Sequence, residues 1–226
     1  MTYESPLQKY AMKPYGGNLL LYKVSACQRN LQNSTVWFFR ASQLEDRMSI
    51  PLTHDEKRQL LSLAGEAISS QIIGSPAHSL ETMSDNLLQK LGCFVTIKVN
   101  DKLRGCIGNL TSEKPLYLLV QEMAVAAATK DPRFYPMKKK DLDDFDLEIS
   151  VLSPLHKIEN IEEIQVGVHG IYLEKDSHRG VLLPQVAIEY GWDRTVFLNQ
   201  TCIKAGLPSD GWHEGADIYI FSAEVF

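Results

Sequence analysis

Hydrophobic residues recur at helical spacing in two stretches of the chain. The first begins after Thr53, which forms a capping-box sequence with Glu56, and it ends before Gly74. The second begins near Pro115, a residue that suits the first turn of a helix. Its apolar positions fall on one face: Leu116, Leu119, Val120, Met123, Ala124 and Ala127. The pattern predicts two amphipathic helices.

A hairpin is predicted between these helices. Residues 92–99 and 102–110 read as strands, and Asn100 and Asp101 form a two-residue turn sequence between them. With this loop, Val95 lies opposite Cys106 and Ile97 lies opposite Arg104. Arg104 and Cys106 then share the more apolar face of the hairpin, and a shift of the pairing by one residue reverses the faces.

The second half of the chain mixes predicted strands and helices. We expect strands over 145–153 and 217–226, a hairpin from 169–176 and 181–184, and helices after Pro184 and Asp193. A weaker helical pattern covers 80–90. Because hairpins imply antiparallel pairing, the predicted fold class is α+β with mainly antiparallel sheets and flanking helices.

The first 47 residues differ from the rest in charge and pattern. They contain six Lys/Arg and three Asp/Glu, so their net charge is +3. Because the whole chain has a net charge of −5, the remaining residues have a net charge of −8. We interpret residues 1–47 as an N-terminal extension and 48–226 as the compact domain. The alternative is an arm that docks through its aromatic side chains. The acidic body disfavours a nucleic-acid partner, which requires a basic face.

The sequence lacks the common motifs for metal, membrane and cofactor binding. The four cysteines form no C-x-x-C pair, and no H-x-x-H or H-E-x-x-H occurs, so we expect reduced thiols, a cytoplasmic location and no metal. No apolar stretch approaches the roughly 18 residues of a membrane span. P-loop, dinucleotide-binding and α/β-hydrolase motifs are absent, and we therefore expect no cofactor.

The stretch KLRGCIGNL, residues 102–110, holds the leading candidate site. A cation two residues away on the same strand face lowers the pKa of a thiol, so Arg104 is predicted to activate Cys106. Gly105 and Gly108 remove side chains that would keep a substrate from the backbone. The alternative is that Cys106 is a small core residue and that the glycines mark a bulge.

A nucleophilic cysteine needs a proton acceptor. His169 starts a predicted strand beside a glycine, and Glu148 lies within the strand 145–153. The alternatives are a turn histidine bonded to backbone and a half-solvated strand carboxylate. Arg133 and Arg179 are predicted in loops, where an arginine suits a carboxylate or phosphate, although most loop arginines are solvated.

The motif LRGCIG resembles that of the AMMECR domain family, named for a chromosomal region linked to Alport syndrome, midface hypoplasia and elliptocytosis. Further blocks resemble the family in order: FVTIK, DPRFYP, ISVLSPL, VGVHGIYL, RGVLLPQVAIEYGWD, FLNQTCIKAGLP and FSAEVF, from about residue 50 to 226. The resemblance implies two closely packed, intertwined α+β subdomains with LRGCIG near the cleft between them. It also implies Memo-like or radical S-adenosylmethionine proteins as partners. Tyr135 stands where the family more often has proline.

The matching blocks also contain Gln185, Glu189 and Trp192, which, with Arg133 and Arg179, we expect to bind substrate. Two functions follow as hypotheses. One is an enzyme that uses Cys106 for group transfer or hydrolysis on a small molecule or a modified protein side chain, with His169 or Glu148 moving protons. The other is a non-catalytic module that binds a ligand or a protein.

Overall fold

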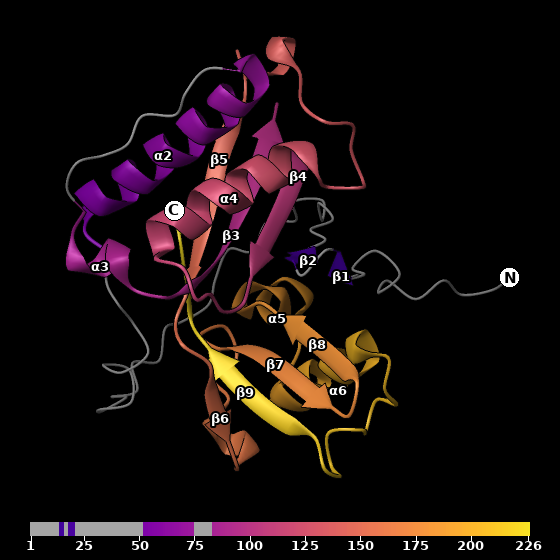
Figure 1. Cartoon of the computed structure of the whole chain (residues 1–226). Helices are drawn as coiled ribbons and strands as arrows, with labels where there is room; N and C mark the ends of the chain where they lie inside the picture. The colour runs from indigo at the N-terminus through magenta and orange to yellow at the C-terminus, as the bar shows by residue number, and fades with distance from the viewer. Residues whose placement is uncertain (1–13, 16–17, 21–51, 75–82) are drawn as a thin grey trace, which may run out of the picture.

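The computed structural model describes residues 14–15, 18–20, 52–74 and 83–226, the first two ranges by backbone alone. The described residues form two subdomains, A and B, each built on an antiparallel sheet (Figure 1). The strands of sheet A, in spatial order, are β1 (Pro14–Tyr15), β2 (Asn18–Leu20), β4 (Lys102–Asn109), β3 (Gly92–Val99), β5 (Asp146–Leu152) and β10 (Ala223–Val225). Those of sheet B are β6 (His156–Ile158), β9 (Asp217–Phe221), β7 (Gly170–Lys175) and β8 (His178–Leu182). The predicted α+β class is confirmed.

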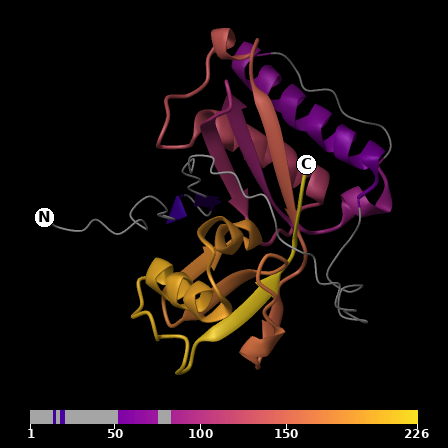
Figure 2. The ribbon, with the colours of Figure 1, turned by 180° about the vertical axis from the view of Figure 1, so that it is seen from behind.

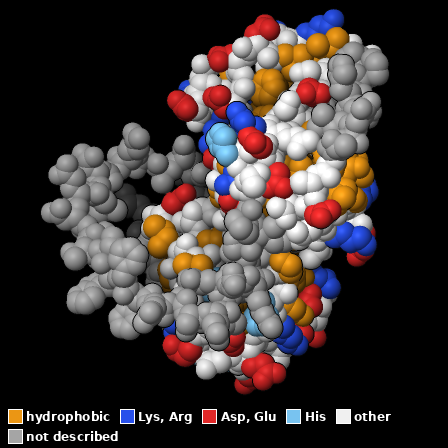
Figure 3. All heavy atoms as spheres, turned by 90° about the vertical axis from the view of Figure 1, so that its left-hand side faces the viewer, with side chains coloured by type: hydrophobic (Ala, Val, Ile, Leu, Met, Phe, Trp, Pro, Cys, Tyr) orange, Lys and Arg blue, Asp and Glu red, His pale blue; other side chains and the backbone are white. Residues whose placement is uncertain are grey.

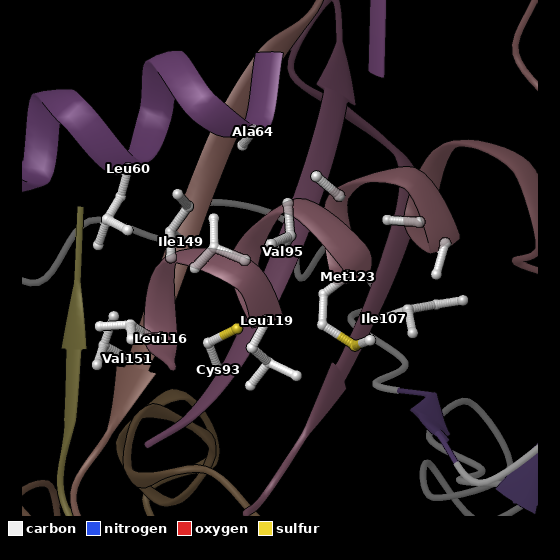
Figure 4. Packing of buried hydrophobic residues seen from close by; sticks show 14 of the residues in the cluster. Leu60, Ala64, Cys93, Val95, Ile107, Leu116, Leu119, Met123, Ile149 and Val151 are labelled. Carbon is white, nitrogen blue, oxygen red and sulfur yellow. The ribbon is translucent and has the colours of Figure 1, made fainter. Parts of the chain in front are cut away.

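Helices α2 (His54–Ile73) and α4 (Leu116–Thr129) cover one face of sheet A, and the short α3 (Asp85–Leu88) lies beside α4. Figure 4 shows Leu60 and Ala64 of α2 meeting the sheet residues that point toward the helices. The predicted capping box is present, because Thr53 and Glu56 bond each other's backbone N–H groups. The two predicted amphipathic helices are therefore confirmed.

Helices α5 (Pro184–Tyr190) and α6 (Arg194–Ala205) pack on sheet B. Seen from behind, sheet A lies in front of its helices, whereas α5 and α6 lie in front of sheet B (Figure 2). The face of sheet A that no described helix covers therefore lies on the same side of the molecule as α5. A third apolar cluster joins the subdomains: Phe94, Leu110, Leu152, Val181, Leu183 and Phe221.

The last segment departs from prediction. A single strand over 217–226 is wrong, because β9 pairs in sheet B and β10 pairs with β5 in sheet A. Ser222 lies between them. Two short 3-10 helices, η2 (Lys139–Asp141) and η3 (Ile161–Glu163), complete the fold. Among the described residues, no helix is long and apolar enough to span a membrane.

The hairpin β3–β4 has the predicted turn but a different register. Asn100 and Asp101 both have positive φ, as a two-residue hairpin turn requires. A bulge at Arg104 then shifts the pairing by one residue, so that Thr96 and not Val95 lies opposite Cys106. The bulge places Cys106 on the face away from α2 and α4.

The predicted boundary at residue 48 lies outside the described residues. Within residues 1–47, β1 and β2 are described, and β2 pairs with β4 at Gly108 and Ile107. The extension therefore stays a prediction, as does the alternative of an arm that docks through aromatic side chains.

Candidate functional site

The Cys106 thiol lies on the face of sheet A that no described helix covers, but it is only 1% exposed. Across the strands it is followed by Thr96 of β3 and Glu148 of β5, which form one row. The Thr96 hydroxyl donates a hydrogen bond to Cys106 Sγ over 3.2 Å. The sulfur is therefore enclosed and has a donor of its own.

Burial raises the pKa of the Cys106 thiol to about 11, and the charges of Asp131 and Glu148 add to the rise. The Thr96 hydrogen bond and the positive charge of Arg133 offset part of it. The direction of this shift is opposite to the one expected from a neighbouring guanidinium, because desolvation outweighs the cation, and the reactivity of Cys106 stays a prediction. The cation that acts on the sulfur is also Arg133 rather than Arg104.

The loop after α4 bonds the outer edge of β4 at Cys106, next to the residues that pair with β2. The Cys106 N–H donates to Asp131 Oδ2 over 2.9 Å, and Arg133 Nη2 donates to the Cys106 carbonyl over 3.3 Å. Arg133 also bonds Asp131 through Nε at 2.9 Å and Nη2 at 2.6 Å. We call Asp131, Arg133 and these bonds the Asp131–Arg133 clasp. It supplies the donor and acceptor that a neighbouring strand would otherwise provide.

Arg104 is held by the same loop. Its Nη2 donates to the Tyr135 carbonyl over 2.6 Å, and Asp141 lies 3.8 Å from it. The Phe134 ring lies 5.8 Å from the Arg104 guanidinium and 5.4 Å from that of Arg133. Arg104 Nη1 is buried without a hydrogen-bond partner. LRGCIG and DPRFYP are thus one structural unit.

The two glycines of LRGCIG are packing positions. A Cβ at Gly105 would lie 2.2 Å from the Ala127 carbonyl oxygen of α4. A Cβ at Gly108 would lie 2.3 Å from the Phe94 ring and from the Cys93 carbonyl. Because the protein itself fills the space beside both residues, substrate binding by these glycines stays a prediction that no described contact supports.

Glu148 lies on the same sheet face as Cys106. Its carboxylate forms an ion pair with Lys98 Nζ at 2.7 Å, and both side chains are about one-quarter exposed. It is therefore a half-solvated strand carboxylate with a partner, one of the two interpretations that the sequence left open. Its role in proton transfer stays a prediction.

The other predicted site residues lie in subdomain B. His169 is buried, and its Nδ1 accepts the Gln165 N–H over 3.2 Å. Arg179 is a strand residue of β8 paired with Glu174, so its placement in a loop is wrong. Trp192 stacks on Tyr190.

Gln185 is half-buried on α5, and Glu189 of the same helix is exposed. The structure thus gathers Cys106, Arg104, Arg133 and Glu148 in subdomain A, together with the two glycines of LRGCIG, whereas the other candidates lie in subdomain B.

Sequence reasoning missed two members of the Cys106 environment. Asp131 is the buried carboxylate of the clasp, and Thr96 donates to the sulfur. Asp131 could have been found from the sequence, because it stands two residues before Arg133 in a loop after a helix, a spacing that allows a local ion pair. Thr96 depended on the bulge. Among the described residues, no three His, Cys, Asp or Glu side chains are arranged to hold a metal ion.

Comparisons with known proteins agree with this architecture. The family model AMMECR1 matches residues 61–226. A protein of Methanothermobacter thermautotrophicus is 44% identical over 185 residues, which cover 78% of this chain and 96% of the relative. A protein of Methanopyrus kandleri is 40% identical over 189 residues, covering 79% and 91%.

A solved structure is similar as well. The crystal structure of an uncharacterized protein from Pyrococcus horikoshii aligns with a TM-score of 0.67 and 38% identity, over 74% of this chain and 88% of that chain. The fold and the sequence of residues 61–226 together show that this chain belongs to the AMMECR1 family.

Proposed function

We propose that the chain is a non-catalytic binding module in which Cys106 packs and does not react. One observation carries this proposal: the thiol is enclosed, accepts a hydrogen bond from Thr96, and has its pKa raised to about 11. At pH 7 such a group is thiolate in only about one molecule in ten thousand. A nucleophilic cysteine needs the opposite shift.

The charges around the thiol support the same conclusion. Arg133 is the cation that acts to lower the pKa of the Cys106 thiol, but it is bound to Asp131 by two side-chain hydrogen bonds. The pair carries no net charge, and its donors are directed at its own carboxylate and at the Cys106 carbonyl. The clasp therefore stabilises the β4 edge and leaves little positive potential for a thiolate or an oxyanion.

Alkylation of the native protein tests this proposal. Iodoacetamide at pH 7.5, followed by peptide mass spectrometry, should modify Cys106 no faster than Cys93 and Cys202, which are also buried. The modification rate of Cys106 should increase about tenfold for each pH unit up to about pH 10, as expected for a thiol of raised pKa. Rapid modification of Cys106 alone near neutral pH would overturn the proposal.

An enzyme that uses Cys106 as its nucleophile is the second candidate function, because Thr96 and Arg133 both act to lower the pKa of this thiol. If a ligand separated Arg133 from Asp131, the guanidinium would be free to stabilise a thiolate. The variant Asp131→Asn imitates this state by removing the carboxylate charge. Under the enzyme hypothesis it raises the alkylation rate at pH 7.5 by tenfold or more relative to wild type, with the folded fraction checked by circular dichroism.

The proposed partners follow from the family resemblance. We propose a cytoplasmic protein that binds a Memo-like or a radical S-adenosylmethionine protein. Size-exclusion chromatography of this chain mixed with each purified candidate, with Cys106→Ser as a matched variant, tests the pairing. Binding by both wild type and variant supports a packing role for the thiol.

A further inference from the structure

The chain between α4 and β5 contains a loop that projects from the side of subdomain A next to β4 (Figure 1). We call residues 130–141 the basic loop. Tyr135 lies in it and is 89% exposed, the largest exposed fraction among the exposed large apolar side chains of the described residues. An aromatic ring so open to solvent buries its apolar surface only when another molecule covers it.

The backbone that carries Tyr135 is fixed on both sides. Arg104 Nη2 holds its carbonyl, and the Phe134 N–H donates to the Asp131 carbonyl over 3.1 Å. On the other side, the Met137 N–H bonds the Ala128 carbonyl at the end of α4, and the Met137 side chain is buried. The ring is therefore presented by an ordered loop, which lowers the entropic cost of binding.

Four exposed lysines lie in the same loop: Lys130, Lys138, Lys139 and Lys140. Of the eight lysines elsewhere in the described chain, five pair with carboxylates: Lys57, Lys90, Lys98, Lys114 and Lys157. The two carboxylates within the basic loop are next to arginines: Asp131 is bound by Arg133, and Asp141 lies near Arg104. The loop is thus a locally positive surface on a body that is negative overall.

A buried donor lies beside this surface. Arg104 Nη1 has no hydrogen-bond acceptor, and a buried unsatisfied N–H group costs free energy. Because this atom is buried, it is out of reach of a docked segment, and the exposed lysines of the loop are the groups that meet a carboxylate there.

We propose that the basic loop is the docking site for an acidic peptide segment of a partner protein. Carboxylates of the segment pair with the lysines, and an apolar residue of the segment covers Tyr135. This inference rests on the proposed binding function and names the chemistry of the partner.

A peptide fits the surface better than a nucleic acid or a membrane. Asp141, Asp143 and Asp144 follow the lysines directly, and residues 48–226 carry −8, so a long polyanion meets repulsion on either side of the loop. On the opposite side of the molecule, Figure 3 shows acidic and basic side chains interspersed, with no extended basic field among the described residues. A short segment with a few carboxylates and one apolar anchor avoids this repulsion.

Fluorescence anisotropy with the full chain tests the proposal. The probe is a labelled peptide of about 12 residues rich in Glu with one central Phe, and its charge-reversed counterpart has Lys in place of Glu. The acidic peptide should bind and the basic one should not. Affinity should fall as salt rises from 50 to 300 mM, because exposed charges are screened over about 10 Å or less at such ionic strengths.

Variants locate the binding surface. Combined Lys138→Glu, Lys139→Glu and Lys140→Glu should weaken binding about tenfold or more, and Tyr135→Ala about fivefold, whereas Tyr135→Phe should bind like wild type. The matched controls are Lys90→Glu, Lys114→Glu and Lys157→Glu combined, and Ile188→Ala at another exposed apolar side chain. These controls should change affinity less than twofold.

Several outcomes would overturn the inference. Equal loss in the control triple variant would mean non-specific attraction, and no binding of the acidic peptide would exclude docking of this class. Tighter binding of a single-stranded RNA of equal length, or of phosphatidylserine vesicles, would assign the loop to another macromolecule. The proposed packing role of Cys106 is judged separately by its alkylation rate, so either proposal fails without the other.

Discussion

The hairpins β3–β4 and β7–β8 solve the same packing problem in the two subdomains. In each, a glycine on the second strand lies directly beneath the helix that covers the sheet. A Cβ at Gly105 would lie 2.2 Å from the Ala127 carbonyl of α4, and one at Gly180 would lie 2.5 Å from the Thr201 carbonyl of α6. A glycine within either strand therefore marks a close approach of helix and sheet.

The hairpins differ in what surrounds the residue next to that glycine. Beside Gly105, the Asp131–Arg133 clasp bonds the backbone of Cys106 and the side chain is enclosed. After Gly180, Val181 is buried as well, but Arg179, the counterpart of Arg104, is largely exposed and pairs with Glu174 of its own hairpin. The comparison teaches that Gly105 of LRGCIG belongs to the common architecture, whereas the clasp distinguishes subdomain A among the described residues.

The largest expected effect is the loss of either glycine. Gly105→Ala and Gly180→Ala should each lower the free energy of unfolding by about 3 kcal/mol or more, because the new methyl group meets helix backbone that cannot move aside. Urea denaturation followed by circular dichroism measures this.

Gly65→Ala is the matched control for the glycine variants. Its Cβ would meet only Leu147 Cδ1 at 3.8 Å, and alanine favours a helix, so stability should rise by about 0.5–1 kcal/mol. If Gly105→Ala were tolerated as well as this control, the common architecture inferred for the two hairpins would be wrong.

Breaking the clasp comes next in size. Asp131→Asn should lower the free energy of unfolding by about 2–3 kcal/mol, because the guanidinium of Arg133 would lose its charge partner in a largely buried position. Hydrogen exchange should also show faster exchange of the Cys106 N–H. Asp217→Asn, in an exposed ion pair of subdomain B, should change stability by less than about 0.5 kcal/mol; equal costs for the two variants would remove the distinction between the subdomains.

Acid should affect subdomain A through Glu56. Hydrogen bonds from Ser84, Thr53 and Asn86 hold the pKa of this carboxyl at about 2, against a desolvation effect that acts to raise it. Because the folded-state pKa is lower than the unfolded value, the stabilisation is present above about pH 4.5 and is lost as pH falls toward 2.

Glu56→Gln should therefore lower stability by about 1–2 kcal/mol at pH 7 and by little at pH 2. Thermal denaturation of wild type and variant across this pH range measures the difference. A constant difference at all pH values would show that the charge of Glu56 is not what stabilises the start of α2.

The smallest expected change in stability concerns polar groups on the sheet faces that no described helix covers. Thr96→Val removes the donor to Cys106 Sγ and should cost about 1 kcal/mol or less. It should also slow alkylation of Cys106 further, since the lost hydrogen bond lowers the pKa of the thiol in wild type.

Tyr172→Phe is the counterpart in sheet B, where the hydroxyl donates to Glu174 over 2.8 Å at a half-buried site. Its cost should be smaller still, because water replaces the lost partner. If Tyr172→Phe lowered the free energy of unfolding more than Thr96→Val, the polar group of sheet B would contribute more to stability than that of sheet A, contrary to this prediction.

Local sequence rules predicted much of the fold because the relevant interactions are close in sequence. The capping box of Thr53 and Glu56 and the turn at Asn100 and Asp101 each depend on residues no more than three positions apart. The bulge at Arg104 was not predictable, since it depends on contacts between β4 and the loop after α4, about 30 residues later. The division of residues 217–226 between two sheets likewise depends on which strand edges are free.

The candidate site was predictable in part for the same reason. LRGCIG drew attention to Cys106, but spacing along one strand could not show that burial outweighs a nearby cation. That balance is set by Thr96, Asp131 and Arg133, which come from three different segments. The sequence identified the motifs and the structure showed that they bind each other.

The crossing of residues 217–226 from one sheet to the other has a consequence for synthesis. During translation, β7 lacks its neighbour β9, and β5 lacks β10, until residues 217–226 have left the ribosome. Phe226 alone makes two backbone hydrogen bonds with Ile149. A nascent chain that stops at residue 216 therefore leaves strand edges open in both sheets at once, and the two halves reach their final pairing together.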